Sequence, residues 1–347
     1  MGVDLGDLAV KHTISVSSLS GKIVAIDAFN ILYQFLASIR QEDGTLLMDY
    51  KGNPTAHLSG LFYRTSRFLE NGLRPVYVFD GQPHVFKKRV QTERSEAKKV
   101  AQKKWEEAME KGDLVSAKKY AQATARLTGP MIEESKKLLD AMGVPHIQAP
   151  RDGEAQAAIM VQKGLAYTTA SQDYDALMFG SPILVRNLSI SGRRKVPKQE
   201  RYILVEPEQI NLQETLTTLG LSREQIIYVG ILLGTDFNQG VKRVGPKTAL
   251  KIVKEKGTME EIEKYVKEKY EYEFEVDVDE VIKLFMNPPY NEVKEKELRW
   301  KEPNMSAITK LLVEQHDFSA DRIGKTVNDL TVLLKERGAQ SKLEQWF

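Results

Sequence analysis

The chain has 347 residues, 41% of them hydrophobic, with 50 basic and 48 acidic side chains and a formal net charge of +2. This length suits one elaborated α/β domain with insertions. Because the net charge is close to zero, the protein as a whole has no strong positive field that would attract nucleic acid. The absence of cysteine excludes disulfides, thiolate zinc sites and cysteine nucleophiles. No secretory signal or apolar run of ~18 residues is recognisable, so we expect an intracellular protein with no membrane partner.

Apolar segments that alternate with helical patterns dominate the first two thirds of the chain. Helices are predicted over 29–39, 58–69 and 130–143 from the spacing of their apolar residues and from the glycines that follow the last two. This alternation is typical of a mostly parallel sheet with right-handed crossovers. The predicted fold class is therefore α/β, a mostly parallel central sheet flanked by helices, with strands at 22–27, 74–79, 144–148, 165–170, 183–188 and 201–205.

Three segments interrupt this alternation. Residues 41–57 are rich in Gly, Asn and Pro turn signals and are predicted to form a turn-rich excursion or hairpin. Residues 84–129 are highly charged with few large apolar side chains, which predicts exposed, projecting helices. The chain after residue 222 has helical periodicity and is expected to end in a short tail beyond Gly338.

Acidic residues follow several of the apolar segments. If the strands form one parallel sheet, their carboxyl ends share the edge at which α/β sheets bind ligands. Individually these acids have ordinary alternatives: Asp152 as a helix N-cap, or Asp173 and Asp175 in Asx turns. Together they would repel one another unless divalent cations neutralised them. The predicted metal ligands are Asp27, Asp80, Asp152, Glu154, Asp173, Asp175 and Asp236.

Clustered carboxylates of this kind suit phosphate chemistry. Two divalent ions ~4 Å apart activate a water and stabilise the leaving oxygen of a phosphoryl displacement. Oxygen ligands favour Mg²⁺ or Mn²⁺, and the lack of cysteine argues against a structural zinc. The leading hypothesis is therefore a metal-dependent site for phosphate chemistry.

The segment from Lys87 to Arg126 carries about twice as many basic as acidic residues. Lys87 and Arg94 are two helical turns apart and therefore share a face. Because the segment begins shortly after Asp80, its base is expected to stand over the acidic edge, where these two cations would hold a phosphodiester. The alternative is a solvated, charged helix.

Residues 234–252 are predicted to form a helix, a tight Val244-Gly245-Pro246 turn and a second helix. Backbone N–H groups at such a turn can point at a phosphate. The segment resembles a helix-hairpin-helix, a sequence-independent duplex-binding element. A purely structural helical hairpin is the alternative.

The chain ends in a pattern of one glutamine, one aliphatic and two aromatic residues. Such a pattern can form one helical turn that fills an apolar pocket of a partner protein. Chain ends usually fray, so an aromatic pair there needs a site, which we expect on a partner rather than on the parent core. The residues concerned are Gln340, Leu343, Trp346 and Phe347.

Together these motifs resemble the flap endonucleases, the structure-specific 5′-nucleases of replication and repair in their archaeal and eukaryotic form. The resemblance covers nearly the whole chain and is highly specific. It is carried by M-G-V at the start, I-D-A-F-N-I-L-Y-Q-F, F-Y-R-T, V-Y-V-F-D-G, A-P-R-D-G-E-A, S-Q-D-Y-D-A-L-M-F-G, L-L-G-T-D-F, V-G-P-K-T-A and the terminal peptide.

The resemblance implies a PIN-like 5′-nuclease core with two magnesium ions. Asp27, Asp80 and Glu154 would mainly hold the first ion. Asp173 and Asp175 would hold the second, and the other two acids would complete the shell. Mn²⁺ is expected to substitute for Mg²⁺.

The resemblance also implies how DNA is held. Lys87 and Arg94 would contact the scissile phosphate, and Tyr33 would stack on a base near the cut. The 84–129 insertion would be an arch that admits a single-stranded 5′ flap, and the 234–252 element would grip the downstream duplex, with a possible potassium ion on its carbonyls. Further DNA contacts would come from Arg64, Arg67, Lys242, Arg243, Gly245 and Lys247.

The sequence departs from the family pattern at three positions. Asp152 stands where the family usually has glutamate, so its metal contact is expected through water. Gln82 follows Asp80-Gly81 where lysine is common. Arg243 replaces the first hairpin glycine, which bears on the potassium site.

The implied organisation is one nuclease domain over 1–338 and a clamp-binding tail over 339–347. The domain comprises an N-terminal part (1–83), the arch (84–129), the remaining sheet with the acidic site (130–220), and the helix-hairpin-helix with the C-terminal helices (221–338). The resemblance predicts a monomeric 5′ flap endonuclease and 5′–3′ exonuclease that binds flap and nicked DNA and a PCNA-type sliding clamp. The resemblance implies that the protein is located in the cytoplasm or nucleoid if it is archaeal, and in the nucleus if it is eukaryotic.

Other functions remain as alternatives. Within the same fold these are a Holliday-junction resolvase, another exonuclease or a small acidic ribonuclease domain, the last being usually much shorter. An aspartyl-phosphate phosphatase needs a second acid two residues after the first, but Phe29 follows Asp27 and Gln82 follows Asp80 at that spacing. A non-catalytic, clamp-tethered DNA scaffold leaves the clustered acids unexplained.

Overall fold

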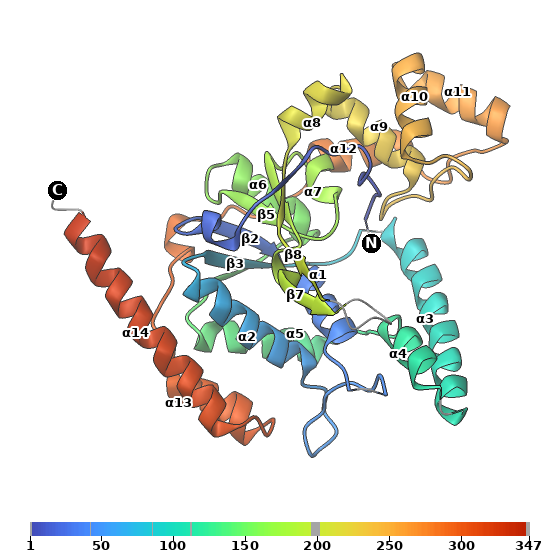
Figure 1. Ribbon diagram of the computed structural model, residues 1–347. Helices are drawn as coiled ribbons and strands as arrows, with labels where there is room; N and C mark the ends of the chain where they lie inside the picture. The colour runs from blue at the N-terminus through green and yellow to red at the C-terminus, as the bar shows by residue number, and fades with distance from the viewer. Residues whose placement is uncertain (1, 42, 85, 112, 196–201, 345–347) are drawn as a thin grey trace.

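The computed structural model describes residues 2–41, 43–84, 86–111, 113–195 and 202–344, with the side chains of 88–94, 114, 115, 118, 193–195, 202, 203 and 337–344 left out of the description. A seven-stranded sheet in the order β1-β9-β6-β5-β2-β3-β4 lies at its centre (Figure 1). The strands are β1 (Lys11–Thr13), β2 (Ile23–Asp27), β3 (Arg74–Phe79), β4 (His146–Gln148), β5 (Thr168–Ala170), β6 (Ile183–Arg186) and β9 (Glu208–Asn211).

The five strands from β6 to β4 are parallel, whereas β9 pairs antiparallel with both β6 and β1. The predicted α/β class with a mostly parallel sheet is therefore confirmed. The strand expected at 201–205 exists as β8 (Tyr202–Val205), but it pairs with β7 (Gly192–Lys195) in a separate two-stranded ribbon. The prediction that this strand belongs to the central sheet was therefore wrong. Strands β1 and β9 were not predicted.

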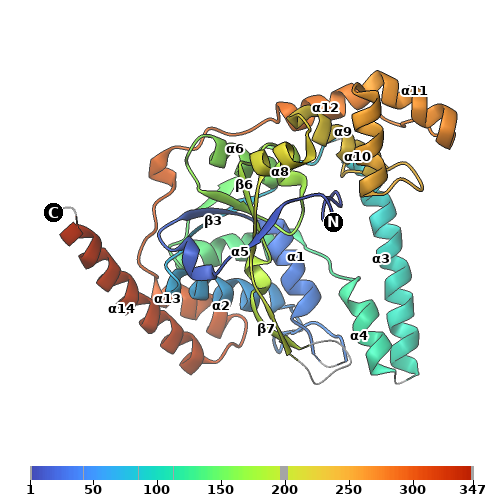
Figure 2. The same ribbon diagram turned by 45° about the horizontal axis from the view of Figure 1, so that its top comes forward.

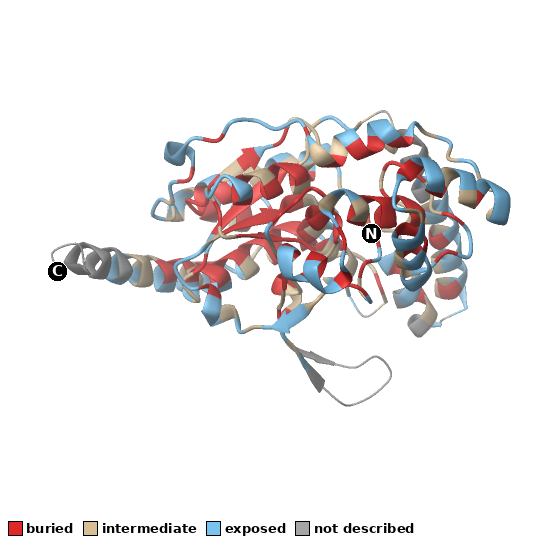
Figure 3. Ribbon diagram, turned by 90° about the horizontal axis from the view of Figure 1, so that it is seen from above, coloured by how far each residue is buried: buried red, intermediate tan, exposed pale blue. Residues whose placement is uncertain are grey.

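Helices cover both faces of the sheet because successive apolar side chains of a strand point to opposite faces. Val24 and Ile26 of β2 pack with α1 (Ala28–Ser38), α2 (Ala56–Glu70) and α5 (Gly129–Ala141). Ala25 packs on the other face with α6 (Gly153–Gln162). The helices predicted at 29–39, 58–69 and 130–143 are thus confirmed as α1, α2 and α5. Figure 3 shows that buried residues concentrate in this layered core.

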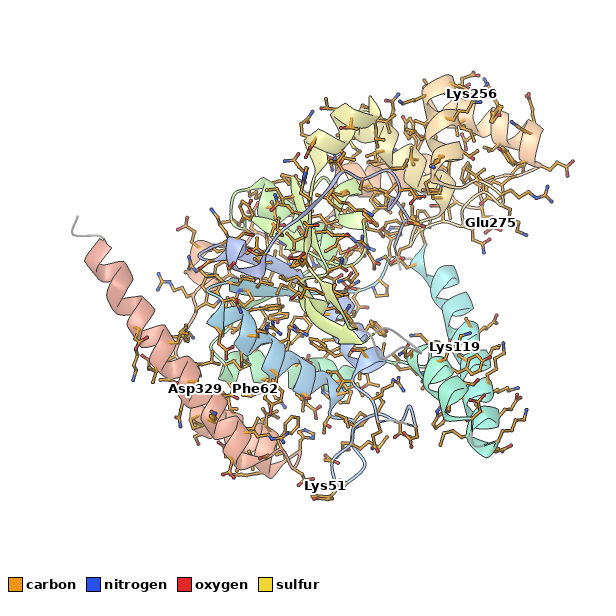
Figure 4. The ribbon with its side chains drawn as sticks, viewed as in Figure 1. Lys51, Phe62, Lys119, Lys256, Glu275 and Asp329 are labelled. Carbon is orange, nitrogen blue, oxygen red and sulfur yellow. The ribbon has the colours of Figure 1, made fainter. Side chains whose placement is uncertain are left out.

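The charged insertion forms two helices, α3 (Lys87–Glu110) and α4 (Leu114–Gln122), that project side by side from the core (Figure 2). Among the described side chains of the two helices, the buried residues are Ala101, Ala108, Ala117 and Ala121. The prediction of projecting helices is confirmed. The 41–57 segment has antiparallel bridges between Arg40 and Leu46 and between Met48 and Pro54, which confirms a hairpin-like excursion with Lys51 at its outer end (Figure 4).

The C-terminal third is helical, as expected. Its elements are α8 (Leu212–Leu219), α9 (Arg223–Leu233), α10 (Pro246–Lys256), α11 (Met259–Tyr270), α12 (Val278–Met286), α13 (Met305–Ile308), a π-helical turn (Thr309–Glu314) and α14 (Ala320–Glu344); α7 (Asp175–Met178) and 3₁₀ turns at Val16–Leu19, Leu188–Ile190 and Glu295–Glu297 complete the chain. Helix α14 continues through Gly338, so the helix does not end where the tail was expected to begin. No helix in the described ranges is long and apolar enough to cross a membrane.

Candidate active site

The predicted acids gather at the carboxyl edge of the parallel strands. Asp27 ends β2 and caps α1 by accepting the N–H of Asn30 at 3.0 Å. Asp80 directly follows β3 and accepts the N–H of Gly153, the first residue of α6, at 2.6 Å. Parallel neighbours place these strand ends side by side, which is why acids distant in sequence become neighbours in space.

The other acids come from helix starts and a helix end. Asp152 is the N-cap residue of α6, and Glu154 lies in the first turn of that helix. Asp175 begins α7 two residues after Asp173, while Asp236 follows the end of helix α9. Each of these carboxylates therefore lies close to the start or the end of a helix.

Burial and mutual repulsion favour the protonated forms of four acids, namely Asp27, Asp80, Glu154 and Asp175. Burial raises the pKa of Asp27 well above its usual value, and the charges of Asp80 and Asp173 raise it further. Burial likewise raises the pKa of Glu154 strongly, with added repulsion from Asp175.

Two further acids have shifted pKa values near neutrality. Burial raises the pKa of Asp80 to about 6, against the opposing attraction of Lys87. Burial, followed by the charges of Asp236 and Asp173, raises the pKa of Asp175 to about 7. The site therefore holds more carboxylates than cations to balance them.

Lys87 supplies part of the missing charge. Its ammonium group hydrogen bonds to Asp152 and lies 3.5 Å from Oδ2 of Asp236. Burial lowers the pKa of Lys87, but the carboxylates of Asp152, Asp236 and Asp80 outweigh burial and raise it overall. The base of α3 therefore reaches into the acids, as the sequence predicted for Lys87.

The donor set fits divalent cations that prefer oxygen ligands. Oε1 of Glu154 is buried and has no hydrogen-bond partner among the described residues, which leaves it available as a ligand. However, in the described ranges no three acidic or histidine side chains already converge closely enough to hold an ion.

Profiles of two protein families match this chain: the XPG N-terminal domain over residues 3–101 and the XPG I-region over residues 143–236. Flap endonuclease 1 of Staphylothermus marinus is 50% identical over the full length of both proteins. The chain belongs to the flap endonuclease family. Members of this family of nucleases depend on divalent metals.

Solved structures of family members and relatives share the fold. A flap endonuclease-1 from Methanococcus jannaschii superposes with a TM-score of 0.74 at 39% identity, covering 97% of this chain and all of that one. The catalytic core of Rad2 in complex with DNA substrate gives a TM-score of 0.70 at 24% identity, covering 95% of this chain and all of that one. The family resemblance inferred from the motifs is confirmed.

The remaining residues predicted near the cut lie on α1 and α3. Tyr33 is 37% exposed on α1, and the ammonium of Lys98 from α3 lies 4.8 Å from its ring centroid. Arg94 belongs to α3, but its side chain falls outside the described residues. Helices α1 and α3 are thus in contact through these two side chains.

Arg64 and Arg67 lie away from the acids, on α2. They line a groove of about 480 Å³ between α1, α2 and residues 189–192. Nη1 of Arg64 donates to the carbonyl of Ser191 at 3.4 Å. Both arginines therefore face the base of the β7–β8 ribbon.

The residues predicted to belong to a helix-hairpin-helix lie in the turn between α9 and α10 and in the first turn of α10. Lys242, Arg243, Gly245 and Lys247 are all exposed. Arg243 adopts a left-handed φ of 68°, the conformation that glycine accommodates best. Gly245 is the N-cap of α10, and a Cβ there would meet no described atom within 4 Å, so its backbone is open to a ligand.

The terminal motif extends beyond the described part of the chain. Gln340 and Leu343 lie on α14 with side chains outside the description, and Trp346 and Phe347 lie outside it altogether. Sequence reasoning missed two residues that touch the acids: the N–H of Val3 donates to Asp175 at 2.7 Å, and the side chain of Asn30 donates to Asp173 at 3.1 Å. The spacing Asp27-x-x-Asn30 at a helix start signals the main-chain bond from Asn30 to Asp27, but not the side-chain bond to Asp173.

Proposed function

We propose that this chain hydrolyses a phosphodiester near the single-strand/duplex junction of 5′-flap DNA, with an accompanying 5′–3′ exonuclease activity. The observation that carries the proposal is the buried acid cluster beneath the arch, with Lys87 reaching into it. A buried set of carboxylates with raised pKa values is typical of a functional site rather than of a structural ion pair.

We assign two magnesium ions, replaceable by Mn²⁺, to these carboxylates. Asp27, Asp80 and Glu154 would hold one ion and Asp173 and Asp175 the other, with the remaining pair of acids, Asp152 and Asp236, as outer ligands. Such ions supply an activated water and charge stabilisation at the leaving oxygen. Oε1 of Glu154, which is buried and has no hydrogen-bond partner within the described part of the chain, supports this assignment.

The residues of the arch would then act on the substrate. Released from Asp152 and Asp236, Lys87 would meet the scissile phosphate, with Arg94 on the same helix beside it. Tyr33 would exchange the cation of Lys98 for the face of a base, since both bind an aromatic ring. The projecting α3–α4 pair would guide the single-stranded flap past these groups.

Two surfaces would hold the duplex. Arg64 and Arg67 would contact its backbone from the groove of α2. The exposed turn before α10 would grip a second backbone through the Gly245 N–H, Lys242, Arg243 and Lys247, with a potassium ion on the hairpin carbonyls. The left-handed φ of Arg243 supports a turn like the one that glycine makes.

The wider role that we propose is Okazaki-fragment maturation and DNA repair by a monomer tethered to a PCNA-type sliding clamp. Gln340, Leu343, Trp346 and Phe347 would make the tether. Deleting residues 340–347 should leave intrinsic cutting unchanged but end stimulation by the clamp. Undiminished stimulation would assign the terminal motif to another role.

The main test uses labelled flap, nicked and four-way DNA, with and without Mg²⁺. Magnesium-dependent cutting at the flap junction is the expected result. A related 5′-nuclease such as a Holliday-junction resolvase would instead cut the four-way DNA and leave the flap intact, and that result would overturn the proposal.

A further inference from the structure

We propose that Asn30 is a positioning residue that aligns the carboxylate of Asp173 for metal binding. Asn30 lies in the first turn of α1, three residues after Asp27. Its Nδ2 donates to Oδ2 of Asp173 at 3.1 Å, and its Oδ1 accepts the backbone N–H of Gln172 at 3.2 Å. Only one of the two amide orientations satisfies both bonds, because a carboxylate accepts and an N–H donates.

The same residue also serves Asp27 through its main chain. The N–H of Asn30 donates to Oδ1 of Asp27 at 3.0 Å. Any residue other than proline at position 30 would provide this bond, whereas the two side-chain bonds require an amide. Asn30 therefore links two acids from neighbouring strands, and its two parts can be separated by mutation.

The electrostatics of the site explain why a neutral donor is useful here. Asp173 repels Asp27, Glu154 and Asp175, since its charge raises the pKa of all three. The hydrogen bond from Asn30 offsets part of this repulsion on the carboxylate of Asp173. An amide holds the carboxylate by one hydrogen bond and adds no positive charge that would compete with a metal ion.

A second contact holds the same turn from the opposite side without touching a metal-binding carboxylate. Arg186 on β6 donates from Nε to the carbonyl of Gln172 at 2.9 Å, and its guanidinium stacks 4.0 Å from the ring centroid of Tyr174. Arg186 thus fixes the backbone of the turn, whereas Asn30 also fixes the carboxylate. This difference provides a matched control.

The inference rests on the proposed two-ion function and is tested by Asn30→Leu. Leucine is similar in size and keeps the main-chain bond to Asp27. We expect the affinity for one of two Mn²⁺ ions, measured by calorimetry on the DNA-free protein, to fall about 10- to 100-fold while the other is unchanged. In cutting assays the Mg²⁺ concentration for half-maximal rate should rise and the KM for flap DNA should stay the same.

Asn30→Gln should recover part of the lost affinity, because it restores an amide one methylene further out. Arg186→Met should lower the melting temperature more than Asn30→Leu but weaken Mn²⁺ binding less. If wild type binds two Mn²⁺ ions and Asn30→Leu binds both equally well, the role of Asn30 is wrong. If wild type binds fewer than two, the proposed two-ion function fails instead. Equal weakening of both ions would also contradict a specific effect on Asp173.

Discussion

The backbone N–H of Val3 donates a 2.7 Å hydrogen bond to Oδ1 of Asp175, a residue 172 positions further along the chain. Val3 is buried, and Asp175 is only 4% exposed. The first residues of the chain are therefore part of the acidic site. They fix the orientation of a carboxylate that would otherwise be free to rotate away from its charged neighbours.

Gly2 provides a test of this packing. A Cβ added to Gly2 would lie 2.2 Å from Oδ1 and 2.6 Å from Cγ of Asp175, so Gly2→Ala must displace the carboxylate. We expect the rate of cutting to fall by about 10- to 100-fold, as for other changes around metal ligands. Gly129→Ala is the control, because a Cβ at this exposed position would meet no described atom within 4 Å. Equal rates for both variants and wild type would contradict the packing.

The raised pKa of Asp175 predicts how the stability of the metal-free protein depends on pH. The folded state binds this proton with a pKa of about 7, and the unfolded state with a pKa near 3.8. Stability from this group is therefore complete below about pH 4 and is lost as the pH rises through about 7. Asp175→Asn should be more stable than wild type at pH 8, by an amount on the order of a few kcal/mol, and equally stable near pH 4.

Asp175→Asn should also bind flap DNA without cutting it. Adding Mg²⁺ should raise the melting temperature of wild type more than that of the variant, since asparagine lacks the charge that attracts the ion.

Denaturation monitored by circular dichroism at pH 8 and near pH 4 compares the stability of wild type with that of Asp175→Asn. A wild-type stability that rises steadily from pH 4 to pH 8 would not fit the assigned pKa.

Lys87 is expected to have two separable roles. In the free protein it offsets the charges of Asp152 and Asp236, so Lys87→Met should lower the melting temperature at neutral pH when no metal is present. With saturating Mg²⁺ the stability difference should shrink, but cutting should remain about 100- to 1,000-fold slower for lack of a cation at the phosphate. Lys99→Met, on an exposed position of the same helix, is the control and should change neither property.

Arg243 occupies a backbone conformation that glycine adopts without strain. Arg243→Gly should raise the free energy of unfolding by about 0.5–1 kcal/mol, because the left-handed φ of 68° costs a side-chain-bearing residue more than glycine. The same change removes a cation from the proposed duplex surface, so the salt dependence of DNA binding should weaken by a slope of about one. Lys242→Ala should show the second effect without the first.

A buried network joins the 41–57 segment to the C-terminal helices. Nδ1 of His316 donates to Oδ2 of Asp49 at 3.0 Å, and Nε2 of His316 lies 3.5 Å from Oε1 of Glu134, and Glu134 also contacts His57 at 3.1 Å. Burial raises the pKa of Asp49, but hydrogen bonds led by those from Asn53 outweigh burial and lower it to about 2.

The stabilising effect of Asp49 is therefore present above about pH 4 and lost as the pH falls towards 2. Asp49→Asn should lower the melting temperature by several degrees at pH 7, and the difference from wild type should vanish near pH 2. Thermal melts across this range check the prediction. A difference in melting temperature that does not change with pH would show that the charge of Asp49 does not stabilise the fold.

Local patterns predicted most of the central fold. The apolar runs of β2, β3 and β6 and the turn signals around α2 and α5 are strong, and acids at strand ends follow from the geometry of parallel sheets. Strands β1 and β9 could not be found in this way. The first is Lys-His-Thr and fully exposed, and its pairing partner lies at the other end of the nuclease core.

Contacts made by short polar groups across long sequence separations were also beyond prediction. Val3 reaches Asp175 through a main-chain N–H, which every residue except proline carries. Gly338 was taken as the end of the last helix, but α14 continues through it because good helix formers flank it on both sides. Tertiary context thus decided the contact of Val3, whereas the helix propensity of the neighbouring residues decided the continuation of α14.

The strand order has a consequence for how the chain folds during its synthesis. The acids span residues 27 to 236, and Lys11 of β1 pairs with Ile210 of β9, so neither the site nor the sheet edge can form from a short nascent chain. Folding that depends on such distant pairings is slow, since the chain must close long loops before it gains their contacts. A growing chain would thus carry an incomplete set of acids until most of the nuclease core had been synthesised, which delays cutting activity until late in translation.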